Sequence, residues 1–257
     1  MKRDDRRQKM IDMLVEEGSV SLDEFARQFD VSKMTIHRDL DDLETEGLLR
    51  KQRGGATIES SAQFESDYRY RTRKAAAEKR LIAEKAAGLI EPGMSVMLDD
   101  SSTSGAIIPF LLEKRPLTVI TNNLSVIDAL SGQAGITVIS LGGTYSRKFN
   151  GFFGLLTEQA LSALRADLVL VSSSSISGST VFHQDQEVIE VKRGMIEAGA
   201  RRYLMADHEK FGRTALHRVA ELDRFDGVIT SDAVAIEDLD RVRTLGIQLH
   251  IAEGDKT

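Results

Sequence analysis

Seven short apolar runs in the second part of the chain constrain its fold more than any other feature. They are SVML at 95–98, LTVI at 117–120, ITVIS at 136–140, DLVLV at 167–171, RYLMA at 202–206, GVIT at 227–230 and QLHIA at 248–252. Helical stretches separate most of them. Short apolar strands that alternate with helices are typical of parallel sheets. We therefore predict an α/β fold here, with a mainly parallel sheet covered on both faces.

The first 58 residues carry a different pattern, that of three helices and a hairpin. Ser21 opens an S-L-D-E capping box, and Ser32 is placed to cap a third helix that ends at Gly47. The buried positions of the first and third helices follow helical spacing, at Ile11, Leu14, Val15, Ile36, Leu40 and Leu43. Two short helices joined by a tight turn indicate a helix-turn-helix, and LLRKQRGGATI at 48–58 is typical of a wing.

These patterns divide the chain into three parts. We expect a winged helix-turn-helix domain at 1–58, a polar and charged linker at 59–74, and an α/β domain at 75–257. A chain of 257 residues has room for one small and one medium domain.

Composition excludes several classes of protein. The chain has no cysteine, which rules out disulfides and thiolate metal sites. The N-terminus, MKRDDRRQKM, lacks the apolar run of a secretory signal, and no stretch approaches the ~20 apolar residues of a membrane helix. We expect a cytoplasmic protein. The net charge is −6, and residues 1–58 hold 11 Lys and Arg against 13 Asp and Glu, so DNA contact depends on local clustering.

The third helix and the wing supply the candidate DNA contacts. The N-terminal half of such a helix enters the major groove, where polar side chains meet bases and phosphates, and a basic wing tip suits the backbone. Each residue alone is more often a cap or a solvated charge, so the prediction depends on their order along the chain. The candidates are Ser32, Lys33, Thr35, His37, Arg38, Arg50, Lys51 and Arg53.

Hydroxyl-rich or glycine-rich loops follow several predicted strands of the α/β domain. In open α/β sheets ligands bind beyond the carboxyl ends of the strands, and hydroxyls and free amides at helix starts suit a phosphate. Any single loop of this kind is more often a helix cap. The candidate ligand residues are Asp99, Asp100, Ser101, Ser102, Thr103, Thr121, Asn122, Asn123, Gly142, Gly143, Lys192, Asp207 and Lys210.

An enzyme is the alternative interpretation of these loops. Asp99, Asp100, Asp207 and Lys192 would then be the acid and base candidates. The α/β domain contains no G-x-G-x-x-G and no Walker-type motif, so the sequence does not support a dinucleotide or NTP site. We expect no cofactor and no metal.

The N-terminal motif resembles that of the DeoR-type (deoxyribose-operon repressor) family of regulators. The family pattern is V-S-x-x-T-[IV]-R-R-D-L, then L-x-x-x-G and a basic stretch ending in G-G-A. The matching residues are Val31, Ser32, Thr35, Ile36, Arg38, Asp39, Leu40, Leu43, Gly47, Arg50, Gly54, Gly55 and Ala56. His37 replaces the usual arginine, and the loss of a permanent charge predicts either weaker phosphate binding or an altered sequence preference. A histidine at this position also predicts a mild dependence of DNA binding on pH.

Residues 75–252 resemble the effector domain of the same family, which is similar in fold to sugar-phosphate isomerases. The matching segments are 99–104, T-N-N at 121–123, L-G-G at 141–143, Gly151, Gly154, Asp167, V-K-R-x-M at 191–195, D-x-x-K-F-G at 207–212 and T-S-D at 230–232. The resemblance implies a homo-oligomeric, DNA-binding regulator of a carbohydrate operon, which we expect to act as a repressor and to be released from its operator by a phosphorylated sugar or related metabolite. It does not distinguish repression from activation, or dimer from tetramer.

Two loops depart from the family pattern. The loop at 99–104 reads D-D-S-S-T-S where the family often has D-S-G-T-T, and the strand at 167–171 leads into S-S-S-S-I-S-G. Because both loops would contact the ligand, the resemblance does not establish which metabolite is bound.

Overall fold

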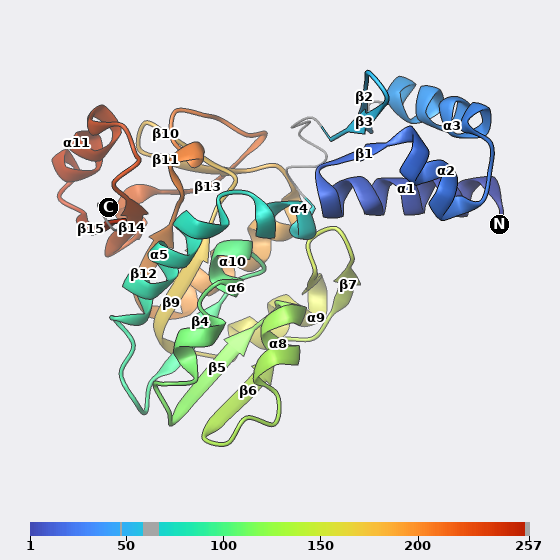
Figure 1. Cartoon of the computed structure of the whole chain (residues 1–257). Coiled ribbons are helices and arrows are strands. Elements are labelled where there is room, and N and C mark those ends of the chain that lie inside the picture. The colour runs from blue at the N-terminus through green and yellow to red at the C-terminus, as the bar shows by residue number, and fades with distance from the viewer. Residues whose placement is uncertain (47, 59–66, 255–257) are drawn as a thin grey trace. The chain divides into compact units, whose positions relative to one another are not determined.

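The chain folds into two compact units, Met1–Lys74 and Ala75–Thr257. The computed structural model describes residues 1–46, 48–58 and 67–254 (Figure 1). The predicted helix end at Gly47 and residues 59–66 of the predicted linker lie outside the described residues. The rest of that linker contains a short helix, α4 (Tyr68–Arg73), which Asp67 caps by accepting a hydrogen bond from the Arg69 amide.

The first unit is a winged helix-turn-helix, as predicted. Its antiparallel sheet has the strand order β1-β3-β2. The elements that precede α4 are α1 (Arg3–Glu17), β1 (Ser19–Ser21), α2 (Leu22–Phe29), α3 (Lys33–Thr45), β2 (Arg50–Gln52) and β3 (Gly55–Thr57). The strand β1 was not predicted, and it joins the wing hairpin to the start of α2.

Local capping explains why the two central helices begin where they do. The hydroxyl of Ser21 accepts a hydrogen bond from the Glu24 amide at 3.2 Å, and that of Ser32 accepts one from the Thr35 amide at 3.2 Å. Between them Asp30 adopts the left-handed conformation, φ 50°, and ends α2. The turn therefore has two side-chain caps and a conformation that Asp tolerates better than most residues.

The second unit is built on a seven-stranded parallel sheet of order β15-β14-β12-β9-β4-β5-β6. All seven predicted runs form its strands. These are β4 (Ser95–Leu98), β5 (Leu117–Thr121), β6 (Ile136–Ser140), β9 (Ala166–Ser172), β12 (Gly199–Met205), β14 (Gly227–Ser231) and β15 (Gln248–Ala252). The mainly parallel α/β architecture is confirmed.

Helices follow most of these strands and supply the side chains that cover the sheet. They are α5 (Ala76–Ala87), α6 (Ser102–Gly105), α7 (Ile108–Leu111), α8 (Leu124–Leu130), α9 (Leu155–Ser162), α10 (Gln186–Ala198) and α11 (Ile236–Thr244). The segment between β4 and β5 forms the two short helices α6 and α7. No helix in the described part of the chain is long and apolar enough to cross a membrane.

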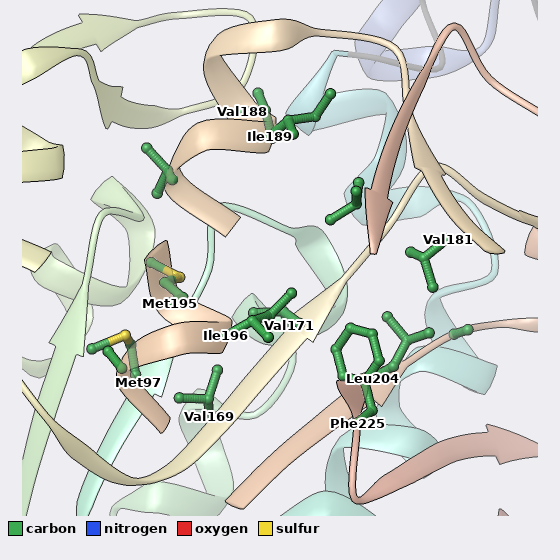
Figure 2. Packing of buried hydrophobic residues seen from close by; sticks show 14 of the residues in the cluster. Met97, Val169, Val171, Val181, Val188, Ile189, Met195, Ile196, Leu204 and Phe225 are labelled. Atoms are coloured by element: carbon green, nitrogen blue, oxygen red, sulfur yellow. The ribbon is translucent and has the colours of Figure 1, made fainter. Parts of the chain in front are cut away.

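Each face of the sheet has its own buried cluster. Val169 and Val171 of β9 pack with Met195 and other residues of α10, as Figure 2 shows. Leu168 and Leu170, which alternate with them, belong to the cluster on the opposite face. Side chains of a strand point to alternate faces, so a continuous apolar run such as DLVLV serves both clusters.

Five further short strands, all in the described part of the second unit, were not predicted. They are β7 (Thr144–Ser146), β8 (Gly151–Phe153), β10 (Ser175–Ser177), β11 (Thr180–His183) and β13 (His217–Glu221). The first two form a hairpin and the other three an antiparallel sheet. Bridges join Asn123 to Gly151 and Ile176 to Phe211, so both additions lie against segments that follow parallel strands.

Candidate functional site

The helix α3 and the wing place the predicted DNA contacts on the first unit. Arg38, Arg50 and Arg53 are exposed. The Ser32 and Thr35 hydroxyls lie 3.0 Å apart, and Ser32 also caps the helix. Lys33 forms an ion pair with Asp23 of α2.

Most acidic side chains of α3 are paired with bases from other elements. Arg6 of α1 donates to the buried carboxylate of Asp39 at 2.6 Å, and Arg3 pairs with Asp42. Lys51 of the wing pairs with Asp41, so this candidate is already engaged with α3. Asp39, Asp41 and Asp42 of α3 therefore each have a basic partner from another element of the unit.

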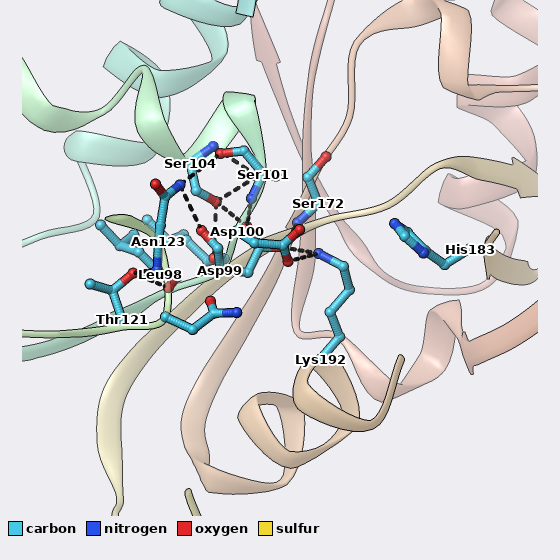
Figure 3. A network of polar contacts seen from close by, with 12 residues as sticks. Leu98, Asp99, Asp100, Ser101, Ser104, Thr121, Asn123, Ser172, His183 and Lys192 are labelled. Atoms are coloured by element: carbon cyan, nitrogen blue, oxygen red, sulfur yellow. Dashed lines mark hydrogen bonds and ion pairs between the residues drawn. The ribbon is translucent and has the colours of Figure 1, made fainter. Parts of the chain in front are cut away.

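A buried polar group lies at the carboxyl edge of the parallel sheet, where the residues after β4 meet α10. Lys192 of α10 forms an ion pair with Asp99, and its Nζ lies 3.2 Å from Asp100 Oδ1 (Figure 3). Lys192 is only 2% exposed and both aspartates are 0% exposed. Burying these charges costs much solvation, which the ion pairs and hydrogen bonds offset.

Asp99 is surrounded by donors. Its Oδ1 accepts hydrogen bonds from the Ser101 amide at 3.1 Å and from Ser104 Oγ at 2.5 Å. Its Oδ2 accepts one from the Ser172 amide at 2.8 Å as well as from Lys192. Burial acts to raise the pKa of Asp99, but Lys192 and the hydrogen bonds outweigh it and hold the pKa below its usual value. An ionised Asp99 therefore ties β4, β9 and α10 together.

The predicted T-N-N segment joins β4 to β5. Thr121 Oγ1 donates to the Leu98 carbonyl at 2.7 Å and accepts a hydrogen bond from the Asn123 amide at 3.0 Å. Asn123 caps α8 by accepting from the Ser125 amide at 2.9 Å, and its Nδ2 donates to the Asp99 carbonyl at 3.3 Å. Ser101 caps α6 in the same way through the Ser104 amide, and Ser102 and Thr103 are buried in that helix.

The unpredicted hairpin β7–β8 packs against these residues. The Phe152 amide donates to the Asn122 carbonyl at 2.9 Å. A Cβ added to Gly151 would lie 3.1 Å from Asp100 Cβ and 3.1 Å from the Asn122 carbonyl oxygen, so any side chain there would crowd the site. The sequence carries a glycine at this point but no strand pattern that would have revealed the hairpin.

The remaining candidates lie in two places. Gly142 and Gly143 contact α9 and β8: Thr157 Oγ1 donates to the Gly142 carbonyl at 2.7 Å, and a Cβ on Gly143 would meet that hydroxyl at 2.2 Å. Asp207 is buried after β12, and the Lys210 amide donates to the Asp207 carbonyl at 3.1 Å.

Two residues near Lys192 were missed. Ser172 supplies an amide to Asp99. His183 of β11 is 4% exposed, and its Nδ1 accepts a hydrogen bond from the Asp185 amide at 3.1 Å, so Nε2 carries the proton in the neutral ring (Figure 3). Ser172 directly follows the predicted strand at 167–171 and was detectable, whereas nothing in the sequence linked His183 to Lys192.

Comparison with known proteins assigns the two units to one family. Residues 6–62 match the DeoR-like helix-turn-helix domain, and residues 74–232 match the DeoR C terminal sensor domain. The chain belongs to the DeoR family of transcriptional regulators.

Relatives of this DeoR-family chain match it over most of its length. A glycerol-3-phosphate regulon repressor from Haemophilus influenzae is 34% identical, covering 90% of this chain and 91% of its own. The HTH-type transcriptional regulator IolR from Bacillus subtilis is 32% identical, covering 96% and 98%. An L-fucose operon activator from Haemophilus influenzae is 34% identical, covering 84% and 86%.

Solved structures resemble the DeoR-family chain less closely. The translation initiation factor eIF-2B from Pyrococcus horikoshii is 14% identical, with a TM-score of 0.47, and covers 88% of this chain and 94% of its own. Ribose 5-phosphate isomerase A from Neisseria gonorrhoeae is 15% identical, with a TM-score of 0.38 and 52% coverage of each chain.

The family assignment decides between the two functions considered from the sequence. The DeoR-family chain is a DNA-binding transcriptional regulator and not an enzyme, so the acid and base roles considered for Asp99, Asp100, Asp207 and Lys192 are withdrawn.

Proposed function

We propose that this regulator controls a carbohydrate operon from the cytoplasm and is released from its operator by a phosphorylated sugar or related metabolite. Its named relatives include a glycerol-3-phosphate regulon repressor and an L-fucose operon activator, which supports a carbohydrate-linked role. The observation that carries the proposal is the buried Lys192–Asp99 group at the carboxyl edge of a parallel sheet, where α/β proteins bind ligands.

In this proposal α3 occupies the major groove. Arg38 is exposed and makes no hydrogen bond or ion pair with any residue that the structure describes, so its guanidinium is available to a guanine or a phosphate. Ser32, Lys33, Thr35 and His37 would contact bases or phosphates beside it, while Arg50, Lys51 and Arg53 of the wing would contact the backbone. A homo-oligomer would present paired units to paired half-sites.

The effector would bind above the sheet edge formed by the residues after β4, β5 and β12. The side chains of Asp99, Thr121 and Asn123 already form hydrogen bonds with other residues of the unit, so they would form the floor of the site. Asp100, Ser101, Ser102, Thr103, Asn122, Lys192, Asp207 and Lys210 would surround the ligand, with Gly142 and Gly143 at the margin. Binding regulates DNA affinity only if the two ligands favour different arrangements of the protein.

Fluorescence anisotropy tests the proposal directly. The full chain is titrated onto a labelled fragment of its own upstream DNA, and a panel of phosphorylated sugars and polyols is then added. We expect salt-sensitive binding and release by one compound at micromolar levels. Arg38→Ala should weaken DNA binding by roughly 10- to 100-fold, whereas Arg243→Ala, an exposed arginine of α11, should not. Absence of salt-sensitive binding would refute the DNA assignment, and binding without release would refute the effector class.

A further inference from the structure

Several buried oxygen atoms at the carboxyl edge of the sheet have no hydrogen-bond partner among the residues that the structure describes. Three of them are Ser173 Oγ, Ser175 Oγ and Asp207 Oδ1. Their residues are 8%, 2% and 2% exposed. A buried polar atom without a partner costs free energy, and native proteins keep few of them. Three in adjacent segments therefore indicate a site where another molecule supplies the missing hydrogen bonds.

The three residues lie on two segments that are paired at both ends but not between them. Ser172 of β9 pairs with Met205 of β12 at the end of the sheet, and Ile176 then bridges Phe211. Ser173, Ser175 and Asp207 all lie between these two points.

Each segment is also held on its outer side. The Ser174 amide donates to the Phe182 carbonyl at 3.2 Å, and the Ala206 amide donates to the Ile229 carbonyl at 3.0 Å. Neighbouring strands therefore anchor both segments. Ser172 connects this place to the group already described, because its amide donates to Asp99.

The chemistry of the three atoms selects the part of a ligand that fits them. A serine hydroxyl both donates and accepts, whereas an ionised carboxylate only accepts. A phosphate next to Asp207 would be repelled, but a ligand hydroxyl can donate to the carboxylate and still accept from a serine. We propose that Ser173, Ser175 and Asp207 form a subsite for the polyhydroxylated end of the effector. This subsite proposal rests on the proposed function, and it adds two serines that determine which effector is recognised.

A ligand-free measurement tests the subsite without knowledge of the effector. Removing a hydroxyl that has no partner should not destabilise the protein, so Ser173→Ala and Ser175→Ala should leave the melting temperature unchanged or raise it. Ser104→Ala is the matched control, since Ser104 donates to Asp99 and accepts from Ser101. We expect Ser104→Ala to lower the melting temperature by about 3–8 °C. If Ser173→Ala and Ser175→Ala lower the melting temperature as much as Ser104→Ala does, the proposal is overturned.

A second measurement uses DNA release. The probes are glycerol 3-phosphate, ribose 5-phosphate and fructose 6-phosphate, with inorganic phosphate as the probe without carbon-bound hydroxyls. For the compound that releases DNA from the unmodified chain, Ser175→Ala and Asp207→Asn should each raise the half-release concentration at least tenfold. Ser162→Ala, on the surface of α9, should not change it.

The possible failures separate the two proposals. An unchanged half-release concentration in Ser175→Ala and Asp207→Asn, or equal release by inorganic phosphate, would overturn the subsite while leaving the effector class intact. If no sugar phosphate releases DNA, the proposed effector class fails, and the ligand-free comparison with Ser104→Ala alone decides for or against the subsite.

Discussion

The buried ion pair of the first unit gives a structural role to a residue of the family motif. Asp39 is 2% exposed, and Arg6, its partner from α1, has a side chain that is 11% exposed. Loss of one member leaves a buried charge without compensation. The aspartate in the R-D-L part of the motif therefore serves the fold of the unit and not the contact with DNA.

We expect Asp39→Asn to destabilise the first unit by about 3 kcal/mol. Urea denaturation followed by circular dichroism would measure the change. Asp41 is on the same helix as Asp39 and is an exposed partner of Lys51. Asp41→Asn should therefore lower the free energy of unfolding by less than about 1 kcal/mol. Equal losses for the two variants would contradict the role assigned to Asp39.

His37 is the position at which this chain departs from the arginine usual in its family. It is half-buried on α3, one residue before Arg38. We expect His37→Arg to strengthen DNA binding and to steepen the dependence of log K on log salt by about 1, since one more phosphate would be neutralised. Anisotropy titrations at several salt concentrations measure this slope. An unchanged slope would place residue 37 away from the phosphates.

His208 makes stability depend on pH. Its Nδ1 lies 2.7 Å from Glu78 Oε2, and this hydrogen bond raises the pKa of His208 above its usual value. The pair therefore stabilises the fold fully below about pH 6.5, the ordinary value for histidine, and the contribution is lost as pH rises through the raised pKa of the folded state.

We expect His208→Gln to remove a small decline in stability above pH 6.5, which thermal melts between pH 5 and pH 9 would detect. The effect should be below about 1 kcal/mol, because the His208 side chain is 44% exposed and solvent screens the pair. His217→Gln is the control and should keep the decline. The same pH profile in His208→Gln and the unmodified chain would exclude His208 as its source.

At the scale of elements, the wing depends on a close approach between strands. A Cβ added to Gly55 of β3 would lie 2.3 Å from the Val20 carbonyl oxygen of β1, whereas one on Gly54 would meet nothing within 4 Å. Gly54 instead adopts φ +86°, which side chains rarely do. The two glycines of the G-G-A motif are thus required for different reasons.

We expect Gly55→Ala to destabilise the first unit by more than about 2 kcal/mol, because neither backbone can move freely. Gly54→Ala should cost about 1 kcal/mol, the usual strain of a left-handed residue. Urea denaturation of both variants gives the comparison. A larger loss for Gly54→Ala would show that turn conformation, not strand contact, determines the stability of the wing.

The sequence predicted elements wherever pattern and burial coincide. All seven parallel strands were found because each is an apolar run, and α2 and α3 because Ser21 and Ser32 cap them. The strands β7, β8 and β10 were missed since TYS, GFF and SIS are too short for an alternating pattern. The helix α4, YRYRTR, lacks apolar periodicity, and its Arg69 instead pairs with Asp12 of α1.

The candidate site, too, could be predicted from the sequence only where its residues adjoin a strand with a recognisable pattern. Asp99, Thr121 and Asn123 converge because residues at the carboxyl ends of parallel strands share one edge of the sheet, and Lys192 reaches Asp99 from the middle of α10. His183 lies on β11 of the antiparallel sheet, which the local sequence did not indicate.

At the scale of the whole molecule, the two units have separate buried cores. The cluster around Phe25, Ile36 and Leu40 contains only residues of the first unit, and the two clusters on the parallel sheet contain only residues of the second. Each unit therefore meets the main requirement for folding alone.

We expect a fragment of residues 75–257 to unfold cooperatively and to bind the effector within about threefold of the full chain, since its site lies within one unit. Calorimetry of the fragment and the full chain tests this. The fragment should not bind DNA. A fragment that fails to fold would show that the first unit contributes to the core of the second.

The Lys192–Asp99 pair has a consequence for how regulators of this design diversify. Its partners come from the protein itself, so this part of the site holds its shape whatever the ligand. The hydroxyls of Ser173 and Ser175, in contrast, form no hydrogen bond with any residue that the structure describes. Mutations at these two serines can therefore change the metabolite that is recognised while the scaffold survives, and a library confined to them is a short route to sensors for new sugars.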